Sequence, residues 1–164
     1  MAPTLSFDAL DAGPDRRKAP AGSRGDCQAH IAVIRCGAGR GIAAMSLLDR
    51  AGSGGEHFIP FSLRELPSQQ GRDYEYAGVT AALDRLLSLG VRRALIHVDD
   101  PLLVSELNKT SEPHRELTML YIALGCKLNE FFSAKVVLVK PERLAALRAK
   151  AESLAAPFAL LPTG

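Results

Sequence analysis

The stretch that most constrains the fold is VRRALIHVDDPLLVSELN, from Val91 to Asn108. Its segment Ala94–Val98 is short, mostly apolar and rich in strand-forming residues, and Asp99 and Asp100 follow it directly. An aspartate before a proline is typical of a helix start, so we predict a helix over Leu102–Asn108. Two carboxylates then lie where a buried strand ends, and in an open α/β sheet that edge usually carries ligands and catalytic groups. Capping of the helix alone is the alternative explanation for the two acids.

The composition bounds the class of protein. A chain of 164 residues with 47% hydrophobic content is long enough for one domain with a sizeable core. The net charge of +2 and the pI near 8.5 are not strongly basic, so any nucleic-acid binding must be local. The 3 cysteines are far apart and have no zinc or disulfide spacing. We therefore expect a soluble, cytoplasmic protein without a signal peptide or a membrane span.

We predict three segments along the chain. Residues 1–26 are rich in Pro, Gly, Ala and charge, which favours a flexible N-terminal arm. A globular domain then covers residues 27–156, and residues 157–164 form a C-terminal tail. The tail contains the apolar string Phe158–Leu161.

Hydrophobic periodicity predicts five strands and four helices. The predicted strands are Gln28–Cys36, Ile42–Leu48, His57–Leu63, Ala94–Val98 and Lys135–Val139. The predicted helices are Arg72–Leu89, Leu102–Asn108, Pro113–Phe131 and Pro141–Ala155. The order β-β-β-α-β-α-α-β-α predicts an α/β fold. Its mixed five-stranded sheet has three antiparallel strands and two strands reached by helical crossovers, with helices flanking the sheet.

Three short strings accompany this order of elements. Tyr74-Glu75-Tyr76-Ala77 lies near the start of the first helix, VDDPLLV covers Val98–Val104, and SEPHREL covers Ser111–Leu117. From about Ala29 to Ala155 the chain resembles the ribonuclease H family. The first string is similar to that family's Ala-Glu-Tyr signature, and the second to its strand-end Asp followed by Ser, any residue and Leu-Val. The third is similar to its Asn-Pro-Glu-Leu stretch.

The resemblance implies a fold and a chemistry. In that family, four carboxylates hold two divalent ions that flank the scissile phosphate of an RNA strand paired with DNA. The resemblance maps two of the catalytic metal ligands onto Glu75 and Asp99, and Asp100 is a further candidate ligand beside them. Mg²⁺ or Mn²⁺ is the implied cofactor, because a hard cation prefers oxygen ligands.

Two positions depart from the family pattern. The family's first Asp precedes a Gly on the opening strand, and Cys36 stands before Gly37 here, next to Arg35. A thiol is a soft ligand that Mg²⁺ does not favour. The family's last Asp lies near the start of the final helix in an Ala-Asp-x-Leu-Ala string. Here AESLA resembles this string and maps the acid onto Glu152, but several residues too far along, whereas Glu142 has the expected position without the string.

These observations predict a ribonuclease H-like domain with an impaired two-metal centre. It would bind nucleic acid, either an RNA/DNA hybrid or RNA, with little or no hydrolysis. One alternative is an active metal-dependent ribonuclease in which Glu75, Asp99, Asp100 and Glu152 hold one or two ions. Another is a protein-interaction module on the same scaffold, for which the string Phe158–Leu161 is the apolar feature.

Overall fold

Five strands form one mixed sheet in the computed structural model, which describes residues 26–50, 52 and 54–159, with only the backbone of residues 157–159. The strands are β1 (Asp26–Gly37), β2 (Arg40–Asp49), β3 (Gly54–Ser62), β4 (Arg93–Val98) and β5 (Ser133–Leu138). The sheet order is β3-β2-β1-β4-β5. β1, β2 and β3 pair antiparallel, and β4 and β5 are added in parallel, which confirms the predicted sheet.

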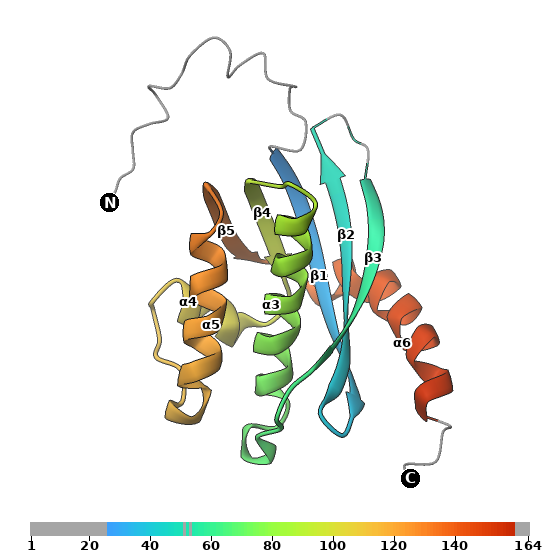
Figure 1. Cartoon of the computed structure of the whole chain (residues 1–164), viewed down its shortest axis with the longest axis vertical. Coiled ribbons are helices and arrows are strands. Elements are labelled where there is room, and N and C mark those ends of the chain that lie inside the picture. The colour runs from blue at the N-terminus through green and yellow to red at the C-terminus, as the bar shows by residue number, and fades with distance from the viewer. Residues whose placement is uncertain (1–25, 51, 53, 160–164) are drawn as a thin grey trace.

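Helices cover both faces of this sheet (Figure 1). The helices are α3 (Arg72–Ser88), α4 (Pro101–Leu107), α5 (Thr118–Asn129) and α6 (Ala145–Ala159). Short 3-10 turns are η2 (Pro67–Gln69), η3 (Arg115–Leu117) and η4 (Pro141–Leu144). α3 and α5 pack on one face of the sheet, and α6 packs on the other.

Several predicted boundaries differ in the structure, three of them at the ends of the domain and in its longest predicted helix. The helix predicted from Pro113 begins as α5 only at Thr118, because His114 has extended backbone and its Nδ1 accepts the N–H of Glu116, which starts the turn η3 instead. The last helix continues to Ala159, beyond the predicted end at Ala155. β1 begins at Asp26, the last residue of the predicted arm; the rest of that arm and residues 160–164 lie outside the described residues.

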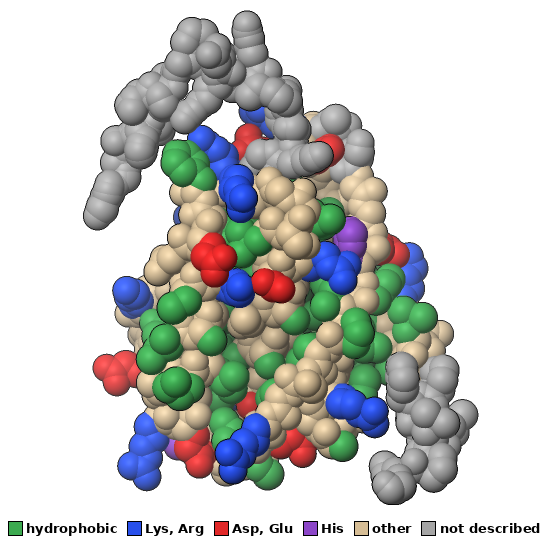
Figure 2. All heavy atoms as spheres, in the orientation of Figure 1, with side chains coloured by type: hydrophobic (Ala, Val, Ile, Leu, Met, Phe, Trp, Pro, Cys, Tyr) green, Lys and Arg blue, Asp and Glu red, His purple; other side chains and the backbone are tan. Residues whose placement is uncertain are grey.

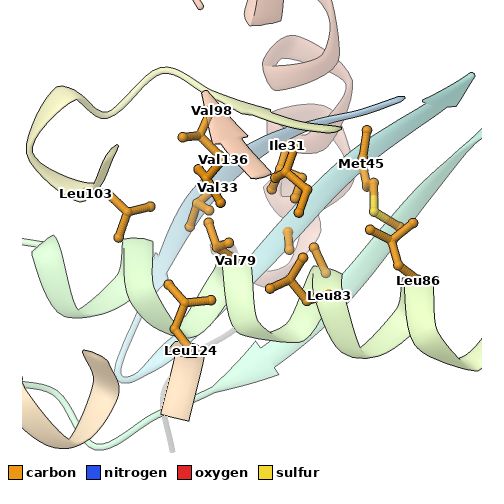
Figure 3. Packing of buried hydrophobic residues seen from close by; sticks show 14 of the residues in the cluster. Ile31, Val33, Met45, Val79, Leu83, Leu86, Val98, Leu103, Leu124 and Val136 are labelled. Carbon is orange, nitrogen blue, oxygen red and sulfur yellow. The ribbon is translucent and has the colours of Figure 1, made fainter. Parts of the chain in front are cut away.

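The core follows the alternation of side chains along β1. Ile31 and Val33 point toward α3, whereas Ala32 and Ile34 point toward α6, as the two-residue period of a strand requires. Figure 3 shows the α3 side, where Val79 and other apolar residues of the helix meet β1 and β2. This buried layer holds α3 in place on the sheet, and the first turn of that helix carries a predicted site residue.

Gly78 lets α3 approach β1 closely. A Cβ atom at this position would lie 2.6 Å from Cγ2 of Val33, well inside van der Waals contact. A larger residue would push the helix away from the strand. The position of Glu75, one turn earlier on α3, therefore depends on a glycine that packs against β1.

Candidate functional site

Three predicted site residues lie together where β4 ends. Glu75 comes from the first turn of α3, and Asp99 and Asp100 follow β4 directly. Glu75 is largely buried, and its pKa is raised to about 8 by burial and by the nearby negative charges of Asp100 and Asp99. We call these three residues the acidic edge.

Asp100 caps helix α4. Its Oδ1 accepts the backbone N–H of Leu102 at 3.0 Å and the N–H of Leu103 at 3.2 Å. The capping explanation therefore holds for Asp100. The side chain of Asp99, which is 13% exposed, has a different partner.

That partner is Arg148, in the first turn of α6. Its Nη2 lies 2.8 Å from Oδ2 of Asp99, and its Nη1 donates to the carbonyl oxygen of Val33 at 2.9 Å. The same guanidinium, together with that of Arg72, opposes the rise in the pKa of Glu75. Sequence reasoning missed Arg148, although it lies near the start of the final helix, where the resemblance places an acid.

The remaining predicted acids take no part in this arrangement. Glu152 is exposed on α6, one turn beyond Arg148, and Glu142 is exposed in η4. Among the residues that the structure describes, neither side chain has a hydrogen bond or an ion pair. The structure thus brings together Glu75, Asp99 and Asp100, and it leaves Glu152 and Glu142 without a contact to them.

Cys36 does not lie beside the acidic edge. β1 and β4 pair in parallel up to His30 and His97. Two residues farther along, the same register puts Ala32 next to Asp99, and Cys36 lies four residues beyond Ala32 on β1. There it lines a surface pocket with residues of β2 and β3. The mapping of the first acid onto Cys36 therefore does not fit the register of the sheet. The absence of that acid does not depend on this mapping, because β1 has no Asp or Glu after its first residue.

A second carboxylate cluster fixes the elements on both sides of the acidic edge. The side chain of Glu106 in α4 is only 3% exposed, and it accepts from Arg72 at 2.8 and 3.0 Å and from the hydroxyl of Tyr76. Burial opposes ionisation of Glu106, but these hydrogen bonds outweigh it and hold its pKa below the usual value. This buried cluster of Arg72, Tyr76 and Glu106 ties α4 to α3.

Exposed arginines lie at the same end of the molecule. Arg40 opens β2 opposite Ser62, the last residue of β3, and Arg64 follows that strand end. Both side chains are exposed, and neither has an ion-pair partner within the described part of the chain. Because β1 and β4 are parallel, their carboxyl ends, and with them the acidic edge, face this end.

The residues present do not fit a two-metal centre. No group of three His, Cys, Asp or Glu side chains in the described ranges is arranged to hold a metal ion. Asp99 is paired with a guanidinium, Asp100 caps a helix, and β1 supplies no carboxylate beside them. A pair of Mg²⁺ ions needs several oxygen ligands, and within the described residues Arg148 and the cap of α4 compete for those of Asp99 and Asp100.

Comparison with solved structures identifies the fold. The crystal structure of ribonuclease H1 from the halophilic archaeon Halobacterium salinarum matches with a TM-score of 0.61 at 18% identity, over 79% of this chain and 96% of that one. The chain has a ribonuclease H-like fold. The N-terminal ribonuclease H domain of a Mycobacterium tuberculosis protein matches with a TM-score of 0.63 at 20% identity, over 82% of this chain and 98% of that chain.

A third ribonuclease H-like structure was determined with nucleic acid. LC11 ribonuclease H1 in complex with an RNA/DNA hybrid matches with a TM-score of 0.57 at 12% identity, over 77% of this chain and 94% of that one. The sequence matches no protein-family model and no curated protein sequence. Among the described residues, no helix combines the length and the apolar character that crossing a membrane requires.

Proposed function

We propose that this chain is a ribonuclease H-like domain that binds nucleic acid, an RNA/DNA hybrid or RNA, with little or no hydrolysis. The observation that carries the proposal is the pairing of Asp99 with Arg148 beside a first strand that has no carboxylate after its first residue, Asp26. The five-stranded sheet and its flanking helices are present. The carboxylate ligands that two-metal hydrolysis needs, as the resemblance implies it, are not all present.

Binding is supported by the fold and by the exposed arginines. A ribonuclease H1 with this fold was solved with an RNA/DNA hybrid. Arg40 and Arg64 leave two guanidinium groups unpaired, within the described residues, at the end that carries the acidic edge. Arginine forks suit phosphate oxygens, and phosphate contacts provide affinity without sequence preference. Because the net charge is only +2, we expect modest affinity.

We expect weak or absent hydrolysis because too few carboxylates are free to bind the metal ions. In two-metal catalysis both ions need shared carboxylates, and each lost carboxylate lowers metal affinity. Burial and the charges of Asp100 and Asp99 raise the pKa of Glu75 to about 8, so a cation that binds this carboxyl must displace its proton. The active alternative requires Glu152 as a ligand, but that residue is exposed and has no contact with the acidic edge in the described structure.

Fluorescence anisotropy with a labelled RNA/DNA hybrid tests binding. We expect salt-dependent binding that weakens in Arg40→Gln/Arg64→Gln, whose salt slope should fall by about 2 because two phosphate contacts are lost. Arg92→Gln/Lys135→Gln is the matched control. It removes two exposed charges, one from the residue before β4 and one from β5, away from the acidic edge. Equal weakening by both double variants, or no binding by the wild type, would contradict the binding proposal.

A cleavage assay on the same hybrid tests hydrolysis. With Mg²⁺ or Mn²⁺ added, we expect turnover orders of magnitude below that of an active ribonuclease H. Robust cleavage that Asp99→Asn abolishes would overturn the impaired-centre proposal and support the active alternative.

A specific surface favours the protein-interaction module as a second candidate. α5 exposes Met119 at 75% and Ile122 at 48%, and Cys126 on the same face is exposed as well. Figure 2 shows hydrophobic side chains gathered over this helix. Such apolar stripes often mark contact surfaces. The predicted apolar feature, Phe158–Leu161, lies in the region where no side chains are described. Absence of salt-dependent hybrid binding would favour this candidate.

A further inference from the structure

The guanidinium of Arg148 joins three elements at the acidic edge. It pairs with Asp99 after β4 at 2.8 Å, donates to the carbonyl oxygen of Val33 on β1 at 2.9 Å, and acts electrostatically on Glu75 of α3. Asp99 is 13% exposed and Arg148 31%, so water screens this pair only in part. The guanidinium is therefore paired with Asp99 and lies within electrostatic range of Glu75.

The position of Arg148 on its own helix is electrostatically unfavourable. It lies in the first turn of α6, where the helix dipole favours negative rather than positive charge. Val33 on β1 and Asp99 just after β4 compensate for this, because the planar guanidinium donates to both at once. The resemblance predicts an acid near the start of this helix, and the structure has a cation there.

We propose that Arg148 is a built-in counter-ion that takes the place of a divalent cation at the acidic edge. Its positive charge neutralises Asp99 and repels Mg²⁺ or Mn²⁺ from the same carboxylates. The inference deepens the proposed function and rests on its impaired metal centre. It predicts that removal of the Arg148 side chain leaves Asp99 without its counter-ion next to Asp100, so that the excess of negative charge attracts a hard cation.

Mn²⁺ binding measured by electron paramagnetic resonance tests the proposal on the full chain without nucleic acid. The signal of free aqueous Mn²⁺ falls when the ion binds protein. We expect no measurable binding by the wild type and binding by Arg148→Gln that is at least about tenfold tighter than the detection limit of the assay, because one unit of repulsion at short range is lost. Adding Asp99→Asn to Arg148→Gln should remove the gain.

Lys150→Gln is the matched control. It removes the same charge two residues along α6, where Lys150 pairs with Glu56 and not with the acidic edge. We expect this variant to bind Mn²⁺ no better than the wild type. A gain as large as that of Arg148→Gln would show that net charge alone governs the ion and would overturn the proposal.

Two further outcomes would also overturn it. One is Mn²⁺ binding by the wild type that disappears in Asp99→Asn, a comparison that needs no Arg148 variant. The other is a folded Arg148→Gln chain that binds no better than Lys150→Gln; circular dichroism checks the fold, and Arg148→Met replaces it if Arg148→Gln does not fold. Because no nucleic acid is present, failure of hybrid binding and failure of this proposal remain distinguishable.

Discussion

Two carboxylate–arginine clusters lie beside α3, and they differ in how completely their polar atoms are paired. In the buried cluster, the oxygens of Glu106 accept from Arg72 and Tyr76. At the acidic edge, Arg148 pairs with Asp99 and acts electrostatically on Glu75, and within the described residues the carboxylate of Glu75 accepts no hydrogen bond. Both carboxylate oxygens of Glu106 are therefore paired in the buried cluster. The acidic edge has more carboxylates than the single guanidinium of Arg148 can neutralise.

The difference separates a structural role from a functional one. A buried carboxylate whose oxygens are all hydrogen-bonded links helices and has no free acceptor for a ligand. A largely buried carboxyl whose pKa is raised toward 8 by burial and by like charges costs stability, and such groups are enriched at functional sites.

The largest effect on stability is expected at the buried cluster. Glu106→Gln removes the negative charge that Arg72 and Tyr76 share and leaves a largely buried guanidinium without its counter-ion. We expect a loss of about 3 kcal/mol or more in the free energy of unfolding, measured by urea denaturation. Asp84→Asn is the control. It breaks the pair between Lys127 and a carboxylate that is 67% exposed, and it should cost less than about 1 kcal/mol. If Glu106→Gln and Asp84→Asn lost similar amounts of unfolding free energy, the buried cluster would be no more important for stability than an exposed ion pair.

The second effect concerns pH. Because the folded-state pKa of Glu75, about 8, lies above its usual value of 4.5, the folded chain holds this proton more tightly than the unfolded chain. The associated stability is complete below about pH 4.5 and is lost as pH rises through 8. Between about pH 6.5 and 8 the wild type should lose about 2 kcal/mol, and Glu75→Gln should lose much less. Parallel pH profiles for the two chains would argue against a raised pKa at Glu75.

A smaller effect is expected at Asp100, which combines both roles. Asp100→Ala removes the cap of α4 and should cost about 1 kcal/mol, measured by thermal or urea unfolding. Asp100→Asn removes the same charge next to Glu75 but keeps a good capping side chain, so it should cost less. If the two substitutions cost the same, the residue contributes through its charge and not through its cap.

The fold was predictable because its signals are local. The period of apolar residues in β1 and α3, and the aspartate followed by proline before α4, each act over a few neighbouring residues. The convergence of Glu75 with Asp99 was predicted by resemblance, and the electrostatics of Glu75 support it. The break of the helix predicted from Pro113 was missed because it depends on a side-chain cap.

The unpredicted part of the site is tertiary. Asp99 and Arg148 are 49 residues apart, and Val33 and Arg148 are 115 apart, so no local pattern announces their contact. Cys36 was misplaced because a Cys-Gly string says nothing about register, whereas the pairing of β1 with β4 fixes which residue faces the acids. The sequence signal that could have indicated this contact was Arg148, a positive charge near the start of the last helix, where the resemblance predicts an acid.

The smallest effect is expected at Glu152, the acid that only a sequence string connects to the site. Glu152→Gln should change the free energy of unfolding by less than about 0.5 kcal/mol, because its side chain is exposed. It should also leave the Mn²⁺ binding gained by Arg148→Gln unchanged, whereas Asp99→Asn removes that binding. If Glu152→Gln reduced the gained Mn²⁺ binding as strongly as Asp99→Asn does, the acidic edge would extend along α6. Four carboxylates would then surround the ion, and the altered metal centre of the active alternative would become the better account of this end of the molecule.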